Sequence, residues 1–186
     1  MQIYYASLDA ISQQTMQLDH VQCIHCGQRA QLVSHGFIYK KQAVATMPEP
    51  VGKRVLCSRR FGHTGCGRTV QLYLDSMVRH LHCGGCTVVA FVLSLMQGLS
   101  IALAYQQASG ANDARHAYRW LNKLFAQLST YRSVVHQVPF DAPTPASTAL
   151  IASRRHLIIA SFVRLLRHFP APLCASFQKT LQTSFL

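Results

Sequence analysis

The cysteine pattern constrains this chain more than any other feature of its sequence. Cys23 and Cys26 are separated by two residues, the spacing at which two thiolates of one turn bind a single Zn²⁺. Such a knuckle supplies half of a tetrahedral site, and the next cysteines along the chain are Cys57 and Cys66. Between the two pairs, residues 36–56 have the pattern of two short strands and a loop. The sequence therefore predicts a small zinc ribbon built on short antiparallel strands.

The second cysteine pair is spaced differently from the first. Eight residues separate Cys57 from Cys66, whereas the two ligands of a knuckle normally have about two to four residues between them. His63 offers a tighter alternative, in which it binds the metal together with Cys66 and Cys57 is only a buried thiol. A chain that holds no metal is the third possibility. We predict the four-cysteine ligand set, which consists of Cys23, Cys26, Cys57 and Cys66.

Four short motifs follow one another over this part of the chain. They are C-x-x-C at 23–26, HG at 35–36, RVLCS at 54–58 and CGRT at 66–69. In this order they resemble the N-terminal zinc ribbon of bacterial insertion-sequence transposases and of their small companion DNA-binding proteins. The resemblance extends over roughly residues 21–130, and in that family a helix-turn-helix follows the ribbon directly. It therefore implies zinc as cofactor and duplex DNA as partner, although the inserted segment RRFGHTG departs from the family pattern.

The cellular compartment bears on how the seven cysteines are used. The N-terminal stretch has no basic segment followed by an apolar run, so it does not predict a secretion signal. We expect a reducing cytoplasm, where metal binding explains cysteines better than disulfides do, and the odd count agrees. The segment RHLHCGGC at 79–86 could form another metal site from His80, His82, Cys83 and Cys86, but we expect the two cysteines to be small residues of an interdomain turn, and Cys174 to be a lone apolar thiol.

A long uncharged stretch follows the cysteine-rich region. Residues 81–112 contain no Asp, Glu, Lys or Arg, and the apolar run 87–105 is long enough to cross a bilayer. Against a membrane span, Gln97 and Gly98 interrupt the run, and Ser100 is placed to cap a second helix. We predict two short helices of a three-helix unit, the first of them mostly buried. The rival hypothesis is a small membrane protein with one span at 87–105 and a basic cytoplasmic ribbon.

The next residues have the pattern of a helix-turn-helix. A short helix is expected at 100–108, a turn at 109–112, and a longer helix, capped by Asn112, at 113–128. One face of the longer helix is apolar and comprises Ala114, Ala117, Leu121, Leu124, Phe125 and Leu128. The opposite face carries groups that suit base edges and phosphates, namely Arg115, His116, Arg119, Asn122 and Lys123. An ordinary amphipathic surface helix would show the same periodicity.

The same helix contains AYRWL, which is similar to the recognition helices of transposase helix-turn-helix units. Here the turn before the helix is one residue longer than in that family. The resemblance thus assigns the polar face of the helix to the major groove, without fixing which side chain meets which base.

The charge balance indicates the class of partner. The chain has 18 Lys+Arg against 6 Asp+Glu, a formal charge of +12, and the excess is spread over most of its length. This balance favours a polyanion such as nucleic acid. The six acids are dispersed, so the carboxylate cluster of a two-metal nuclease is not predicted, and we expect no enzyme. Around the second cysteine pair, the residues assigned to phosphate contacts are Lys53, Arg54, Arg59, Arg60 and Arg68.

The predicted organisation is α+β, with five successive parts. They are an N-terminal arm (1–20), the zinc ribbon (21–82), a helix-turn-helix unit (83–138), a proline-rich linker (139–146), and a basic amphipathic helix with a tail (147–186). The helix at 147–169 could pack on the helical unit, self-associate or contact another protein. We expect a transposase-like recognition module for transposition or regulation that binds duplex DNA and lacks a catalytic domain. An RNA-binding zinc-ribbon protein is the other alternative.

Overall fold

The computed structural model describes residues 2–40, 47–136 and 153–186. The chain is α+β and divides into two compact units. The first unit comprises residues 1–84 together with 175–184, and the second comprises 85–174 together with 185–186. The predicted linker and the first residues of the predicted C-terminal helix lie outside the described residues.

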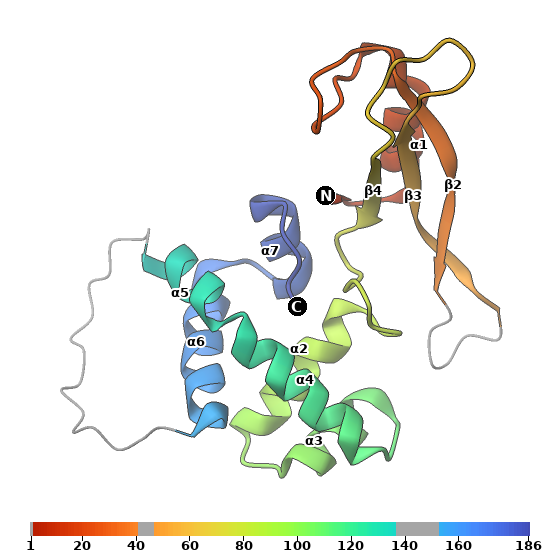
Figure 1. Ribbon diagram of the computed structural model, residues 1–186. Helices are drawn as coiled ribbons and strands as arrows, with labels where there is room; N and C mark the ends of the chain where they lie inside the picture. The colour runs from red at the N-terminus through yellow and green to blue at the C-terminus, as the bar shows by residue number, and fades with distance from the viewer. Residues whose placement is uncertain (1, 41–46, 137–152) are drawn as a thin grey trace. The chain divides into compact units, whose positions relative to one another are not determined.

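A four-stranded sheet forms the centre of the first unit, with the strand order β1-β4-β3-β2 (Figure 1). The strands are β1 (Gln2–Tyr5), β2 (Leu32–Lys40), β3 (Glu49–Cys57) and β4 (Thr69–Leu74). β1 runs parallel to β4, whereas β4, β3 and β2 are antiparallel neighbours. The antiparallel pair β2 and β3 confirms the two strands predicted between the cysteine pairs, although β2 begins earlier than expected.

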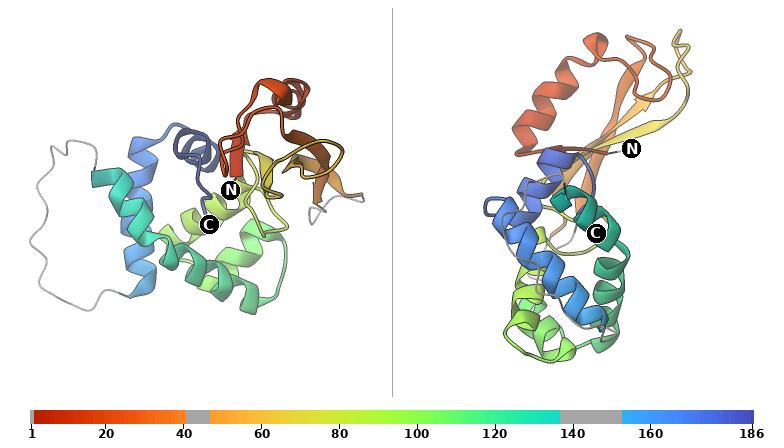
Figure 2. Two further views of the ribbon diagram at one scale, coloured as in Figure 1. Left: turned by 45° about the horizontal axis from the view of Figure 1, so that its top comes forward. Right: turned by 90° about the vertical axis from the view of Figure 1, so that its left-hand side faces the viewer.

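One face of this sheet is covered by α1 (Leu8–Met16), which is followed by the short 3-10 helix η1 (Leu18–His20) (Figure 2). Ser7 caps α1, since its Oγ accepts a hydrogen bond from the backbone N–H of Ala10 at 3.1 Å. Within the predicted arm (1–20), the described residues 2–20 thus form a strand and two helical elements. The core between α1 and the sheet contains Ile11, Leu18, Leu32, Val55, Val70 and Leu72.

The segment 175–184 completes the first unit, although it comes near the end of the sequence. The side-chain amide of Gln182 pairs with the backbone of the edge strand β1, because its Oε1 accepts from Tyr4 N–H at 2.7 Å and its Nε2 donates to Tyr4 O at 3.3 Å. Gln178 is fully buried and donates from Nε2 to the carbonyl oxygens of Asp75, at 2.6 Å, and Met77, at 3.0 Å. This segment therefore binds backbone groups of the edge strand β1 and of the turn that follows the inner strand β4.

Helices build the second unit (Figure 1). They are α2 (Gly85–Met96), α3 (Ile101–Ser109), α4 (Ala114–Ala126), α5 (Leu128–His136) and α6 (Arg154–His168), and α7 (Leu173–Leu181) begins in this unit. The break between α2 and α3 confirms the predicted interruption of the uncharged stretch. Ser100 caps α3 as expected, with its Oγ accepting from Leu103 N–H at 3.3 Å.

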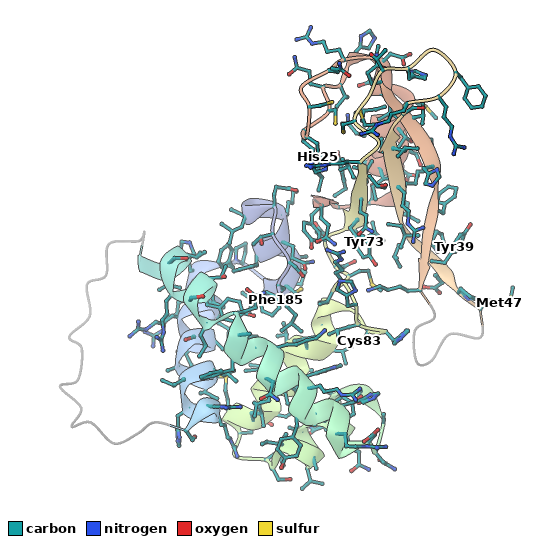
Figure 3. The ribbon with its side chains drawn as sticks, in the orientation of Figure 1. His25, Tyr39, Met47, Tyr73, Cys83 and Phe185 are labelled. Atoms are coloured by element: carbon teal, nitrogen blue, oxygen red, sulfur yellow. The ribbon has the colours of Figure 1, made fainter. Side chains whose placement is uncertain are left out.

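Aromatic rings occupy the core of the helical unit. Trp120 on α4 packs edge to face against Tyr105, with ring centroids 5.0 Å apart, and against Phe91, at 5.7 Å. Farther along the chain, Tyr131 donates its hydroxyl to the carbonyl oxygen of Phe185 at 2.6 Å, and their rings lie 5.5 Å apart. Figure 3 labels Phe185 among the side chains of these helices. The apolar faces of α2 and α4 are thus buried in this unit, as their sequence pattern predicts.

Candidate metal centre

The first cysteine knuckle is a tight turn after η1. Its ends are joined by two backbone hydrogen bonds, from Gly27 N–H to Cys23 O at 2.7 Å and from Cys23 N–H to Gln28 O at 2.9 Å. The backbone N–H of His25, which is labelled in Figure 3, points at the Sγ of Cys23 over 3.4 Å. Gly27 has a φ of +73°, a left-handed conformation that favours glycine. This turn therefore presents both sulfurs of the C-x-x-C motif on one side.

The second knuckle repeats this arrangement at the end of β3. Gly67 N–H bonds Cys57 O at 2.8 Å, and Gly67 has the same φ of +73° as Gly27 in the first knuckle. A backbone N–H again points at the first sulfur, here from Cys66 to the Sγ of Cys57 over 3.2 Å. The two knuckles are therefore the same local structure, in spite of their different spacing in the sequence.

A hydrogen bond across the base of the inserted loop explains the unusual spacing. Gly65 N–H bonds Ser58 O at 2.7 Å, so these two residues lie side by side and residues 59–64 loop out between them. Without that loop, the knuckle would have the sequence Cys-Ser-Gly-Cys, which has the ordinary C-x-x-C spacing. The insertion therefore extends the knuckle without separating its two sulfurs.

The two knuckles meet, and their four thiols form one cluster. All four sulfur atoms lie within 4.8 Å of one another. Across the two knuckles, the Sγ atoms of Cys23 and Cys66 are 3.7 Å apart, and those of Cys26 and Cys57 are also 3.7 Å apart. A tetrahedral ion with metal–sulfur bonds of about 2.3 Å has sulfur–sulfur edges of about 3.8 Å. The cluster could therefore hold a metal ion with little rearrangement.

The alternative ligand His63 has a different neighbour. Its Nδ1 lies 3.1 Å from the carbonyl oxygen of Ala30, and the group of potential ligands in the described part of the chain contains Cys57 in its place. Cys57 is fully buried. The structure thus groups the four predicted cysteines together. Cys83 and Cys86 lie outside this group, and Cys174 is buried, as expected for an apolar thiol.

Burial and hydrogen bonding act in opposite directions on the clustered thiols. At Cys23, burial opposes ionisation, but the N–H groups of His25 and Cys26 and the neighbouring thiols outweigh it and lower the pKa to about 7. At Cys57, burial dominates and raises the pKa to about 12, although the N–H of Cys66 acts against it. A cation among the four sulfurs would favour the thiolate at both positions.

The basic side chains around the second knuckle differ in how much they are engaged. Arg59 binds the loop itself, because its Nε donates to Gly65 O at 3.2 Å and its Nη2 donates to Cys66 O at 2.6 Å. Lys53 donates to the Oγ1 of Thr15 at 3.1 Å, and its Nζ lies 4.8 Å from the ring centroid of Phe37. The remaining members of the predicted phosphate-binding set are exposed, and they are Arg54, Arg60 and Arg68.

Most of the polar face of α4 is exposed, and one prediction about its first turn needs correction. Asp113, not Asn112, caps the helix, since its Oδ1 accepts from Arg115 N–H at 2.9 Å. The same carboxylate forms an ion pair with the Arg115 side chain, at 3.3 Å, and lies 3.8 Å from the Nε2 of His116. The N–H of Arg115 and then its side chain hold the pKa of Asp113 below its usual value. Both basic side chains nonetheless remain exposed.

Farther along α4, the predicted DNA-binding residues have different surroundings. Arg119 is exposed, whereas Lys123 is half-buried. Asn122 is exposed, but its Oδ1 accepts a hydrogen bond from Arg154 of α6 at 3.1 Å. Tyr118, to which the sequence pattern assigns no role, is 54% exposed on the same helix. The solvent side of α4 therefore offers cationic, amide and phenol groups together.

No family model matches this chain, and neither a curated protein nor a solved structure does. The geometry of the knuckles and of α4 is therefore the basis for any assignment of function.

The helices of the described residues are short for a membrane span. No single helix among them is long and apolar enough to cross a bilayer. The segment 87–105, the predicted span of the rival hypothesis, is divided between α2 and α3. Only α6 and α7 taken together have the length and apolar composition of a membrane span, and the two helices are bent by 77° relative to each other.

Proposed function

We propose that this protein is a zinc-dependent DNA-binding protein, in which a zinc ribbon and a helix-turn-helix unit bind one duplex. The observation that carries the proposal is the four-thiol cluster, which supports exposed arginines on its second knuckle. Four sulfurs at tetrahedral spacing suit Zn²⁺, and a closed set of four protein ligands is typical of structural zinc sites. In this proposal, zinc holds the two knuckles together and has no role in a chemical reaction.

Helices α3 and α4 are proposed to be the helix-turn-helix. They are joined by a short turn that begins at Gly110, whose φ of +70° ends α3, and that closes with the cap of α4 at Asp113. The buried face of α4 fixes the helix in its unit, and the exposed Arg115 and Arg119 on the other face would enter a major groove. Arginine suits this task because its guanidinium can bind the N7 and O6 atoms of guanine together.

The acidic residues support the same proposal by their placement. Among the described residues of α3, α4 and the turn between them, Asp113 is the only carboxylate, and two basic side chains lie beside it. A duplex phosphate therefore meets little repulsion on this surface. Binding to the ends of mobile elements and binding to a promoter would use this surface in the same way.

The metal part of the proposal is tested by analysis of the purified, reduced protein. We expect close to one zinc per chain, and we expect loss of zinc when Cys57 is replaced by Ser. His63→Ala should keep the zinc, because His63 lies outside the sulfur cluster. A dialysed, reduced protein that keeps its fold without metal would contradict this part.

The DNA part is tested by titrating duplexes at several salt concentrations. R115A and R119A should each cost about 1–3 kcal/mol at a selected site and little on random DNA. R60A and R68A should weaken all duplexes alike and reduce the salt slope by about one. R132A, at an exposed arginine of α5, is the matched control and should behave as wild type. Tighter binding of the wild type to single-stranded or duplex RNA would favour the RNA-binding alternative instead.

A further inference from the structure

The inserted loop of the second knuckle carries a phenylalanine at its tip. Phe61 is 96% exposed, the largest exposure among the large apolar side chains of the described residues. It has a φ of +55° and is followed by Gly62, with a φ of +84°. The N–H of His63 bonds Arg60 O at 3.1 Å and closes a tight turn around these two residues. Positive φ at both central positions is typical of a type I′ turn, in which asparagine and glycine are preferred and phenylalanine is disfavoured.

The loop is held in one conformation by contacts at its base. Ser58 and Gly65 close it through their backbone bond, and the guanidinium of Arg59 donates to the carbonyl oxygens of Gly65 and Cys66. Two further contacts tie the loop to the connection between the first knuckle and β2, because Thr64 N–H bonds the Oε1 of Gln31 at 2.7 Å and His63 contacts Ala30 O. The base of the loop is thus held by several contacts, and a group ordered in advance loses little entropy when it binds.

Arginines flank this aromatic tip along the chain. Arg59 and Arg60 directly precede Phe61, and Arg68 follows the Cys66-Gly67 end of the knuckle. All three arginines are exposed. The sequence contains no acidic residue between Glu49 and Asp75. A strained, exposed phenylalanine contributes nothing to the core, so its conformation is better explained by a ligand than by folding. The charge around it selects a polyanion.

We propose that Phe61 is a wedge that stacks on a nucleobase at an opened base step of DNA, while the neighbouring arginines bind the flanking phosphates. This inference rests on the proposed DNA-binding function and names a contact within it. Apolar side chains of DNA-bending proteins enter base steps in this way, and aromatic rings stack on any base because every base has a π face. The inserted loop would then set where the duplex is opened.

Two exposed rings elsewhere in the unit differ from Phe61. Phe37 on β2 is 47% exposed, but the ammonium of Lys53 lies over it and the ring of Tyr39 is 6.1 Å away. Figure 3 shows Tyr39 on β2, near the end of the hairpin. These rings lie on the sheet surface and do not project from a loop, so the wedge is assigned to Phe61.

The test compares two short duplexes that differ only in one central T·T mismatch. Opening a base step costs least at a mismatch, so the zinc-loaded wild type should bind the mismatched duplex about fivefold more tightly or better. F61N should lose this preference, and it should keep its zinc and its thermal stability because asparagine suits the turn. F61W, which keeps an aromatic ring, should retain the preference.

M16A removes another exposed apolar side chain of the same unit and serves as the control, with binding equal to wild type. An F61N protein that keeps the preference, or that loses affinity for both duplexes equally, would overturn the inference and leave the proposed function intact. A wild type that binds neither duplex would overturn the proposed function itself.

Discussion

Gly65 lies where any larger residue would collide with the second knuckle. A Cβ atom at this position would be 2.4 Å from Ser58 O and 2.5 Å from the Sγ of Cys57. We predict that Gly65→Ala lowers zinc affinity at least about tenfold, because the collision displaces a metal ligand and the base of the loop. The measurement is competition for zinc with a chelator of known affinity.

Gly27→Ala is the control for this prediction. Gly27 also has positive φ, but no atom lies within 4 Å of the position that a Cβ would take there, so only the backbone strain of about 1–2 kcal/mol is expected. Equal losses at Gly65 and Gly27 would show that steric contact with the sulfur has no special effect.

The two perturbed thiols predict how metal affinity varies with pH. The pKa of Cys57 lies above its ordinary value of 9.0, so the protonated thiol stabilises the metal-free protein, and this effect is complete below pH 9.0. A metal ion must therefore displace a proton from Cys57 when it binds. Cys23, with a pKa of about 7, is already a thiolate above neutrality and competes for protons only below it. Zinc affinity should therefore fall with decreasing pH, and more steeply below pH 7. Cobalt titrations at several pH values measure this, and a flat profile would contradict it.

The first turn of α4 combines a cap with an ion pair, both formed by Asp113. We predict that Asp113→Asn keeps the helix, since asparagine caps as well as aspartate does. The change removes the negative charge beside Arg115 and His116, so affinity for duplex DNA should rise and its salt dependence should steepen. Anisotropy titrations against salt measure both effects. Asp113→Ala removes the cap as well, and its helicity should fall in circular dichroism.

Elements with strong local signals were predictable from the sequence. Gln97, Gly98 and Ser100 mark the break between α2 and α3, and apolar residues that recur every three to four positions mark the buried face of α4. The cap of α4 was placed one residue too early, because Asn112 and Asp113 are both good caps and only the backbone decides between them.

The site was predictable in its ligands and unpredictable in its supporting contacts. A Cys-Gly pair ends each knuckle, Cys26-Gly27 and Cys66-Gly67, and this repeated pair is a local signal of their likeness that the spacing rule overlooks. The bond between Ser58 and Gly65 has no such signal, because it joins backbone atoms across a loop of arbitrary sequence. β1 and α1 were missed as well. For β1 the reason is its length, since a four-residue strand has too few positions to show a period.

Gln178 joins two distant parts of the chain, because its side-chain amide binds the C-terminal segment to the turn after β4. Gln178→Ala would remove the side-chain amide that donates to the carbonyls of the buried residues Asp75 and Met77, and we predict a loss of about 1–3 kcal/mol of stability. Two probes separate the units, because cobalt bound to the cysteines reports on the first and Trp120, the single tryptophan, reports on the second. The cobalt signal should be lost at a lower temperature than in wild type. T180A, at an exposed neighbour on α7, is the control and should leave it unchanged.

The contact between Tyr4 and Gln182 spans 178 positions of the chain. During synthesis, this separation delays the pairing of β1 with the C-terminal segment. The strand β1 leaves the ribosome well before the side chain that pairs with its backbone, because both knuckles and all of α2 to α6 are translated between them. From the completion of β4 until Gln182 is translated, the nascent sheet therefore lacks this contact at its β1 edge, and an uncovered edge can pair with another chain. Early binding of zinc by the knuckles would hold the rest of the sheet together during that interval.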